Sequence, residues 1–250
     1  MDRRKNPIAV FDSGAGGISV LKELVKIMPG ENYIYFGDSL NAPYGTKSTR
    51  KVRELTMENV AKLVDMGAKE VIVACNTATS AAVRPLREMY PLVSMVGIEP
   101  AIKPAAAEGG RVLVMATNLT LREEKLKRLT ELYQDRADII LLPCSPLVEF
   151  VERGITNGEE LDSYLKGILS PYINSVNSIV LGCTHFPLVK DAIQKAAGDV
   201  KLFDGGRGVA KQAKRLLERA DLLSDGEKGT IKFISSLEGK EELYKRLFNF

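Results

Sequence analysis

Two cysteines share a sequence context that suits acid–base chemistry. Cys75 follows the mostly apolar run 70–74, and Cys183 follows the mostly apolar run 178–182. Short apolar runs rich in β-branched residues predict buried strands, so each thiol is expected at a strand end. Hydrogen-bonding side chains come directly after both thiols: Asn76 and Thr77 after the first, Thr184 and His185 after the second. We therefore interpret Cys75 and Cys183 as two groups that face one site.

A pair of opposed thiols can do what one thiol cannot. A single cysteine beside a histidine favours nucleophilic attack, as in hydrolases and transferases. Two thiols on opposite faces of a carbon allow one thiolate to remove a proton while the other thiol donates a proton to the far side, which inverts the stereocentre. Contact distances of ~3 to 3.5 Å on each side would place the sulfurs roughly 6 to 7 Å apart, too far for a disulfide bond of about 2.05 Å.

Simpler interpretations of the cysteines remain open at this level. An isolated cysteine is most often a small buried apolar side chain. Cys144 has few polar neighbours in the sequence and is assigned such a structural role. Cys75 and Cys183 are both expected at a helix entrance, where the helix dipole favours the thiolate. His185, the one histidine of the chain, is placed to orient or activate the Cys183 thiol.

A glycine-rich segment, residues 12–17, follows another expected strand. Glycines at a helix start let backbone N–H groups approach an anion. The segment lacks the Lys-Ser/Thr of a phosphate loop and the spacing of a dinucleotide-binding loop, and its glycines could serve only the strand-to-helix turn. Asp12 would repel an anion, so we expect it to pair with an ammonium group or to orient a group that transfers protons.

The segment 38–48 is polar and rich in turn-forming residues. In one interpretation, Pro43, Tyr44 and Gly45 only stabilise a loop between a strand and the next helix. In the other, Tyr44 and the exposed backbone beside it reach over the active-site cleft.

Short apolar runs alternate with amphipathic patterns along the chain. This alternation is typical of an α/β protein with mostly parallel sheets covered by helices. Strands are expected near 7–11, 32–36, 70–74, 94–97, 111–115, 137–141, 177–181, 200–203 and 231–235. One intervening helix is expected to bury Leu121, Leu126, Leu129 and Leu132.

Three strand ends recur in the same order in the second half of the chain. The offsets are 104 residues from Ser13 to Thr117 (117 − 13), 106 from Ser39 to Ser145 (145 − 39) and 108 from Cys75 to Cys183 (183 − 75). The nearly constant spacing indicates two similar α/β domains related by a pseudo-twofold axis, with an active site in the cleft where the strand ends converge. Domain junctions are expected at 97–100 and 204–206, where a helix breaker or glycines follow a strand.

Composition excludes several functional classes. The chain has 250 residues and a net charge of +3 with both signs interspersed, so it lacks the basic stripe that nucleic-acid binding requires. No apolar run approaches membrane-spanning length, and the apolar residues 7–11 are too few for a signal peptide. Three cysteines without a CxxC pair, together with one histidine, argue for a reducing cytoplasm and against a zinc site or a disulfide framework.

Seven short motifs follow one another along nearly the whole chain. They are Val10-Phe11-Asp12-Ser13-Gly14, Gly16-Gly17, Tyr35-Phe36-Gly37-Asp38, Pro43-Tyr44-Gly45, Ala74-Cys75-Asn76-Thr77-Ala78, Gly97-Ile98-Glu99-Pro100 and Leu181-Gly182-Cys183-Thr184-His185. The ordered set resembles the glutamate racemase family, within the cofactor-independent aspartate/glutamate racemase superfamily. The resemblance implies interconversion of L- and D-glutamate without cofactor or metal, supplying D-glutamate for bacterial peptidoglycan. It also implies a cytoplasmic homodimer, each subunit having one domain of residues 1–97 and 206–250 and a second of residues 98–205.

By position, the resemblance also implies roles for single residues. Cys75 and Cys183 would be the two acid–base residues. Asp12 would assist the first thiol or meet the substrate ammonium, and His185 would assist the second thiol. Glu149 would correspond to a family glutamate near the site. The residues that would hold the amino acid are Asp12, Ser13, Tyr44, Gly45, Asn76, Thr77, Thr117, Thr184 and His185.

Other functions remain open from the sequence. Aspartate racemase, or another amino-acid racemase of the superfamily, can differ by one substrate methylene, a distinction worth only about 1 to 3 kcal/mol in a pocket. A non-catalytic module that binds phosphate or a nucleotide at the glycine-rich segment would be stabilised by nucleotide rather than by glutamate. In a lyase or transferase with a single catalytic cysteine, either Cys75 or Cys183 would be dispensable.

Overall fold

The computed structural model describes residues 2–249, which form two compact units. The first unit comprises residues 2–98 and 206–249, and the second comprises residues 99–205. Each unit is built on one parallel sheet covered by helices. The expected α/β fold class with parallel sheets is confirmed.

The first unit contains a five-stranded sheet in the order β4-β3-β1-β2-β9, with all neighbours parallel. The strands are β1 (Ile8–Asp12), β2 (Tyr33–Gly37), β3 (Glu70–Val73), β4 (Ser94–Gly97) and β9 (Ile231–Ser235). Every residue of β1, β2 and β3 is buried. Helices on both faces explain why these strands have continuous apolar sequences rather than an alternating pattern.

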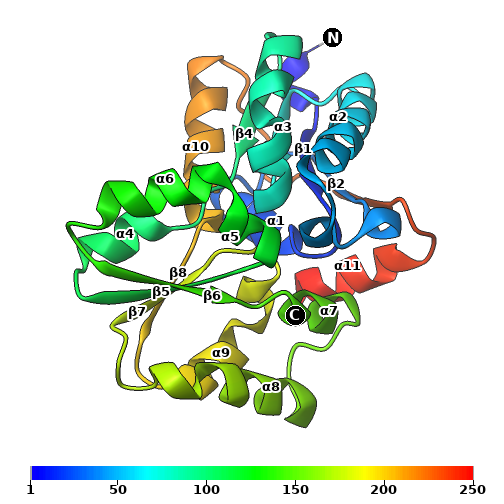
Figure 1. The fold of residues 1–250 in the computed structure, drawn as a ribbon. Helices are drawn as coiled ribbons and strands as arrows, with labels where there is room; N and C mark the ends of the chain where they lie inside the picture. The colour runs from blue at the N-terminus through cyan, green and yellow to red at the C-terminus, as the bar shows by residue number, and fades with distance from the viewer. Residues whose placement is uncertain (1, 250) are drawn as a thin grey trace. The chain divides into compact units, whose positions relative to one another are not determined.

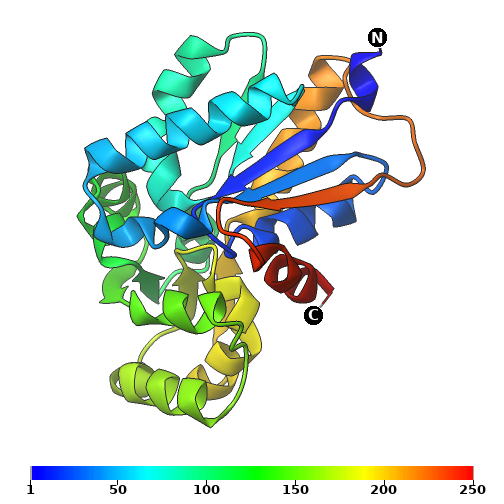
Figure 2. The same ribbon diagram turned by 90° about the vertical axis from the view of Figure 1, so that its right-hand side faces the viewer.

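Helices cover both faces of this first sheet (Figures 1 and 2). On one face, α1 (Ile18–Ile27) packs against α10 (Gly206–Arg219) and α11 (Lys240–Asn249). On the other face, α2 (Thr49–Asp65) packs against α3 (Asn76–Met89). Three short 3-10 helices complete the unit: η1 (Arg3–Lys5), η2 (Ser39–Asn41) and η3 (Tyr44–Thr46).

The second unit contains a four-stranded parallel sheet in the order β6-β5-β7-β8. Its strands are β5 (Arg111–Ala116), β6 (Asp138–Pro143), β7 (Ser178–Leu181) and β8 (Lys201–Asp204). Its helices are α4 (Ile102–Ala107), α5 (Asn118–Arg122), α6 (Glu124–Tyr133), α7 (Pro146–Glu152), α8 (Glu159–Leu169), α9 (Lys190–Ala197), η4 (Ser170–Tyr172) and η5 (Phe186–Val189). Helix α4 packs against α6, and α8 packs against α9.

The two sheets repeat one topology. Within the first sheet the order β2-β1-β3-β4 matches the order β6-β5-β7-β8 of the second. Cys75 and Cys183 follow the corresponding strands β3 and β7. Strand β9, which lies beside β2, has no counterpart in the second sheet. All nine expected strands are confirmed, so the weak sequence repeat reflects a repeat of strand order.

One helix prediction was wrong in part. The expected single helix is two helices, α5 and α6. Leu126 is buried and Leu129 packs against the same core, whereas Leu132 is 69% exposed. Tyr133 packs against this core instead and is partly buried, because it lies four residues after Leu129 on the same helix face. Leu132 is turned by about 120° from Leu126.

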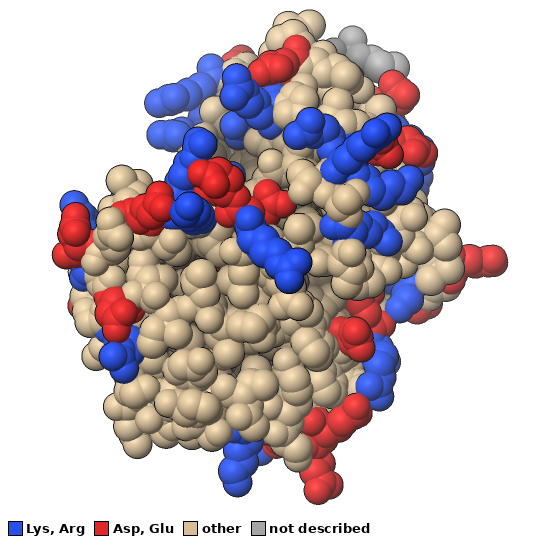
Figure 3. All heavy atoms as spheres, viewed as in Figure 1, with Lys and Arg blue, Asp and Glu red and all other residues tan. Residues whose placement is uncertain are grey.

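Charged side chains of both signs are mixed on the face drawn in Figure 3. Exposed ion pairs one helical turn apart include Arg50 with Glu54 and Lys62 with Glu58. Pairs of this kind are worth about 0.3 to 0.5 kcal/mol each, so they contribute little to holding the fold. Among residues 2–249, no helix is long and apolar enough to cross a lipid bilayer.

Candidate active site

Three polar side chains follow adjacent strands of the first sheet. Asp12 ends β1, Asp38 directly follows β2, and Cys75 lies two residues after β3. Because β1 lies between β2 and β3 and all three are parallel, these positions share one edge of the sheet. The Ala74 N–H extends the strand pairing by donating to the Phe11 carbonyl at 2.8 Å. All three polar side chains are buried.

The Asp12 carboxylate is bound within its own turn. The Gly14 N–H donates to Asp12 Oδ1 at 2.9 Å. From β2, the Tyr35 hydroxyl donates to the Gly14 carbonyl at 2.6 Å and so supports the turn. The Gly14 N–H is thus directed at a carboxylate of the protein, which weakens the interpretation of residues 12–17 as a phosphate loop.

Gly17 lies against Asp12 at the start of α1. A Cβ atom at this position would lie 2.6 Å from Asp12 Cβ and 3.2 Å from Ala74 Cβ. Separations of that size are too short for two carbon atoms. The glycine therefore allows α1 to approach the strand ends that carry Asp12 and Cys75.

Asp38 connects β2 to the loop of residues 39–48, called the Tyr44 loop below. No role was predicted for Asp38 from the sequence. Its Oδ2 accepts from the Tyr44 hydroxyl at 2.6 Å and from Asn59 Nδ2 at 3.1 Å. Burial, followed by the hydrogen bond to Asp38, raises the pKa of Tyr44 far above its usual range, so Tyr44 stays a neutral phenol. The sequence signal that could have identified Asp38 was its position at a strand end, as for Asp12 on the neighbouring strand.

Cys75 is the N-cap residue of α3, directly before the first helical residue. It is 6% exposed, and its carbonyl accepts from the Thr79 N–H at 2.8 Å. The positive end of the helix dipole therefore lies at Cys75. The next side chain, Asn76, is buried, and its Oδ1 has no hydrogen-bond partner among the described residues. A buried amide oxygen without a donor is unusual, so we interpret it as an acceptor for a ligand.

In the second unit, Cys183 lies in a chain of contacts with a histidine and a glutamate. Cys183 Sγ lies 3.5 Å from His185 Nδ1, and His185 Nε2 donates to Glu152 Oε1 at 2.8 Å. Burial by itself would lower the pKa of His185, but the contacts with Cys183 and Glu152 raise this pKa well above its usual value. The buried imidazole therefore favours its charged form, with Nδ1 facing the sulfur.

Cys183 does not lie at an α-helix entrance, contrary to the expectation. The chain forms the 3-10 helix η5 from Phe186, and α9 begins only at Lys190. Val189 departs from α-helical geometry (φ −119°, ψ 23°), which separates the two helices. Of the two thiols, Cys75 thus lies at the positive end of an α-helix, whereas Cys183 lies beside the imidazole of His185.

The glutamate that contacts His185 is Glu152, not Glu149. Both residues belong to α7, but Glu149 is exposed, whereas the Glu152 side chain is only 16% exposed and bonds to the ring. A separation of three residues turns a side chain by about 60° and moves it about 4.5 Å along the helix, which is enough to decide between them. The sequence offered two glutamates on one short helix and no signal to choose.

Three further residues of the second unit lie close to its strand ends. Thr117 is buried and caps α5, with its Oγ1 at 2.9 Å from Thr120 Oγ1. Thr184 is buried directly after Cys183. Burial, with the charge of Cys183 as the second cause, raises the pKa of Cys144 to about 12, and its Sγ donates to the Leu142 carbonyl at 3.4 Å. An un-ionised Cys144 suits the structural role expected for it.

Each unit therefore carries its own group of expected residues. Those of the first unit are Asp12, Ser13, Tyr44, Gly45, Cys75, Asn76 and Thr77. Those of the second unit are Thr117, Glu149, Cys183, Thr184 and His185. The bond to His185 adds Glu152, which was not expected from the sequence. Within residues 2–249, no three His, Cys, Asp or Glu side chains are grouped so as to hold a metal ion.

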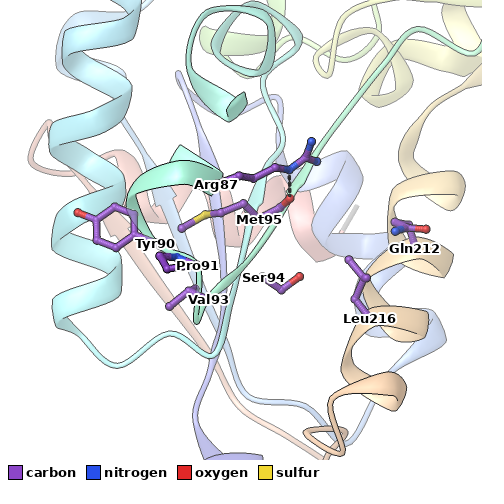
Figure 4. Close-up of a pocket in the computed structure, with 8 residues that line it drawn as sticks. All are labelled: Arg87, Tyr90, Pro91, Val93, Ser94, Met95, Gln212 and Leu216. Carbon is purple, nitrogen blue, oxygen red and sulfur yellow. Dashed lines mark hydrogen bonds between the residues drawn. The ribbon is translucent and has the colours of Figure 1, made fainter. Parts of the chain in front are cut away.

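A cavity of about 460 Å³ in the first unit lies away from these residues (Figure 4). It opens between the end of α3, the start of β4 and α10. The Arg87 side chain lines it and donates from Nε to the Met95 carbonyl at 3.0 Å. The residues lining it are Arg87, Tyr90, Pro91, Val93, Ser94, Met95, Gln212 and Leu216. They include none of the candidate residues, which follow the opposite, carboxyl ends of the strands.

Comparison with known proteins decides the family. Residues 8–213 match the family described as Asp/Glu/Hydantoin racemase. The chain belongs to this racemase family. A glutamate racemase of Clostridium acetobutylicum is 50% identical to it, covering 95% of this chain and 94% of that protein. Another, from Clostridium botulinum (strain Alaska E43 / Type E3), is 47% identical and covers 99% and 98% of the two chains.

Solved structures of such racemases have the same fold. The glutamate racemase of Francisella tularensis in complex with D-glutamate superimposes on this racemase with a TM-score of 0.85 at 28% identity, covering 99% of this chain and 95% of that one. The Escherichia coli enzyme, in complex with L-glutamate and an activator, UDP-MurNAc-Ala, also gives 0.85, at 30% identity and coverages of 97% and 95%. The α/β fold implied by the sequence motifs is thereby confirmed for this racemase.

Proposed function

We propose that this racemase interconverts L- and D-glutamate, with Cys75 and Cys183 acting on opposite faces of one α-carbon. The observation that carries the proposal is the equivalence of β3 and β7. Two residues after the end of each strand lies a buried cysteine, followed by polar side chains. The names of the relatives, and the glutamate in the F. tularensis and E. coli structures, support glutamate as the substrate.

In the proposed reaction, the thiolate of one cysteine removes the α-proton, and the electron pair of the C–H bond passes into the carboxylate as an enolate. The thiol of the other cysteine then gives its proton to the opposite face of the carbon. One thiolate becomes a thiol and one thiol becomes a thiolate, so protons and charge balance. The reverse reaction uses the same two groups in exchanged roles.

The two thiols have different assistants in this scheme. In the first unit, Asp12 assists Cys75 or pairs with the substrate ammonium, and the unpartnered Asn76 Oδ1 accepts from that ammonium. In the second unit, a charged His185, held by Glu152, stabilises the thiolate of Cys183. The further groups proposed to hold the amino acid are Ser13, Tyr44, Gly45, Thr77, Thr117 and Thr184.

The direct test follows optical activity and isotope exchange. L-Glutamate and D-glutamate should each be converted to the racemic mixture, and in D2O deuterium should enter the α-carbon of both enantiomers. No racemisation of glutamate without added cofactor would contradict the proposal. A parallel assay with aspartate measures the preference that a single methylene confers. Thermal stabilisation by nucleotide, and not by glutamate, would favour a nucleotide-binding module instead.

Exchanging Glu152 for glutamine should show which of the two glutamates of α7, Glu149 or Glu152, supports catalysis. The change removes the charge that helps to raise the pKa of His185, so kcat/KM is expected to fall by about 10- to 100-fold, with the loss greatest toward high pH. Glu149→Gln should stay within about threefold of the parent. Measuring kcat/KM against pH for both variants decides the matter, and a larger loss in Glu149→Gln would restore the assignment made from sequence.

Replacing Gly17 with alanine should displace Asp12 from its position in the proposed site. The added Cβ would overlap Asp12, and the expected loss is about 1 to 3 kcal/mol in stability and about tenfold or more in kcat/KM. Gly208→Ala in α10 is a matched control, since a Cβ there meets no atom within 4 Å. Thermal unfolding and steady-state kinetics measure both effects. Equal activity of the two variants would remove Asp12 from the proposed site.

The wider role is part of the same proposal. The D-glutamate formed would supply bacterial peptidoglycan synthesis in the cytoplasm, and the enzyme would act as a homodimer. Growth of a bacterium that requires external D-glutamate, restored by this gene, tests the first statement. Sedimentation at several concentrations tests the second.

A further inference from the structure

The C-terminal segment, which contains strand β9 and helix α11 (residues 231–249), lies beside the start of the Tyr44 loop. Strand β9 lies beside β2 and pairs with it in parallel (Figure 2). The register places Ser235 opposite Gly37. The Ser236 N–H continues this pairing by donating to the Gly37 carbonyl at 3.1 Å. Residues almost 200 positions apart in sequence are thereby brought into contact.

Ser236 binds the loop at two points. Its hydroxyl donates to Asp38 Oδ1 at 2.7 Å, and the same oxygen accepts from the Leu40 N–H at 3.0 Å. The other carboxylate oxygen of Asp38 accepts from Tyr44 and Asn59. Ser236 thus fixes one oxygen of a carboxylate whose second oxygen holds the Tyr44 side chain.

Tyr244 of α11 contacts the start of the same loop through its hydroxyl group. The side chain is fully buried, and its hydroxyl lies 2.7 Å from Ser39 Oγ, 3.1 Å from Ser235 Oγ and 3.3 Å from the Gly37 carbonyl. A Cβ on Gly37 would lie only 2.2 Å from the Tyr244 hydroxyl, so strand and helix meet with no room for a side chain.

The Tyr244 ring also reaches the turn that holds Asp12. Its ring packs edge-on against Tyr35, with centroids 5.0 Å apart at 74°. The Tyr35 hydroxyl in turn binds the Gly14 carbonyl. One buried aromatic pair therefore lies under both the Asp12 turn and the start of the Tyr44 loop.

We propose that Ser236 and Tyr244 are positioning residues for substrate binding, acting through Asp38 and Ser39 on the Tyr44 loop. The proposal rests on the proposed function, because it takes that loop to contact the amino acid. The loop would bind the ground state and the transition state alike, so its displacement should raise KM more than it lowers kcat.

The test compares Tyr244→Phe and Ser236→Ala with a matched control. Tyr33→Phe removes an equally buried hydroxyl, which donates to the Met28 and Leu24 carbonyls at the opposite end of β2. Racemisation by the parent chain is measured first, and its absence would mean that the proposed function has failed. Kinetic constants are then normalised to folded protein, with stability measured by thermal unfolding.

We expect the two test variants to raise KM for glutamate about tenfold while kcat stays within about threefold, as for the loss of one hydrogen bond that orders a binding group. Tyr33→Phe should lose comparable stability but keep the parent KM. Ser236→Thr, which retains the hydroxyl, should restore KM toward the parent value. If the parent racemises glutamate and the test variants keep its KM, or if Tyr33→Phe shows the same increase, the C-terminal segment has no positioning role.

Discussion

Substitution of either Cys75 or Cys183 by alanine is expected to lower racemisation by about 10³-fold or more. Each change removes one of the two groups that carry the proton, and the third cysteine, Cys144, follows a different strand, β6. The effect should appear in kcat for both directions, because each direction needs both groups. Polarimetry of purified variants measures it.

Isotope exchange should distinguish the two variants. The remaining thiolate can still remove the α-proton of the enantiomer that faces it and return a solvent proton to the same face. Each variant should therefore exchange one enantiomer with D2O and not the other, and the two variants should favour opposite enantiomers. Cys144→Ser is the control, since this buried thiol has no part in the scheme. Full racemisation by either alanine variant would refute the two-base mechanism and favour a single catalytic cysteine.

Replacing Glu70 with glutamine is expected to abolish much of the pH dependence of stability. Glu70 begins β3, is fully buried, and neither carboxyl oxygen has a hydrogen-bond partner among the described residues. Burial raises its pKa to about 8, the nearby Glu31 adds to the increase, and Ser94 and Lys69 oppose it. The Ser94 side chain is near, but outside hydrogen-bond geometry. Lys69 is itself bound to Glu31 at 2.6 Å.

The sign follows from proton binding. Between the ordinary pKa of 4.5 and about 8, folded chains hold a proton on Glu70 that unfolded chains have released. Stability should therefore fall as the pH rises through this window, by about 3 to 4 kcal/mol between roughly pH 5 and pH 8. The Glu70→Gln variant has no carboxyl group at this position to titrate. The difference between its free energy of unfolding and that of the parent should therefore grow by about 3 to 4 kcal/mol between roughly pH 5 and pH 8.

Denaturant unfolding at several pH values measures this difference, and Glu238→Gln, at an exposed position, is the control. The contributions of all other titratable groups to the pH dependence cancel, because each variant is compared with the parent at the same pH. A difference between Glu70→Gln and the parent that does not change with pH would show that the folded chain does not hold this proton.

The sequence by itself determined the strand pattern, the repeat and the two thiols. Each depends on a few contiguous residues: an apolar run long enough for a strand, and a polar residue where the run ends. Because parallel strands put their carboxyl ends at one sheet edge, those local patterns predicted that polar residues after the strands would converge. The link between Asp12 and Cys75 was implied by the family resemblance. The repeated spacing likewise predicted that Cys75 and Cys183 follow corresponding strands.

Only the tertiary structure decided which side chains support these groups. Glu152 rather than Glu149 meets His185 because of the angle at which α7 presents its residues. Ser236 and Tyr244 reach the Tyr44 loop across 198 and 205 residues of sequence, through the pairing of β9 with β2. Cys183 meets a 3-10 helix instead of an α-helix, so a charged histidine, and not a helix dipole, lies beside its sulfur. Such contacts depend on distances between elements, and local sequence periodicity carries no information about them.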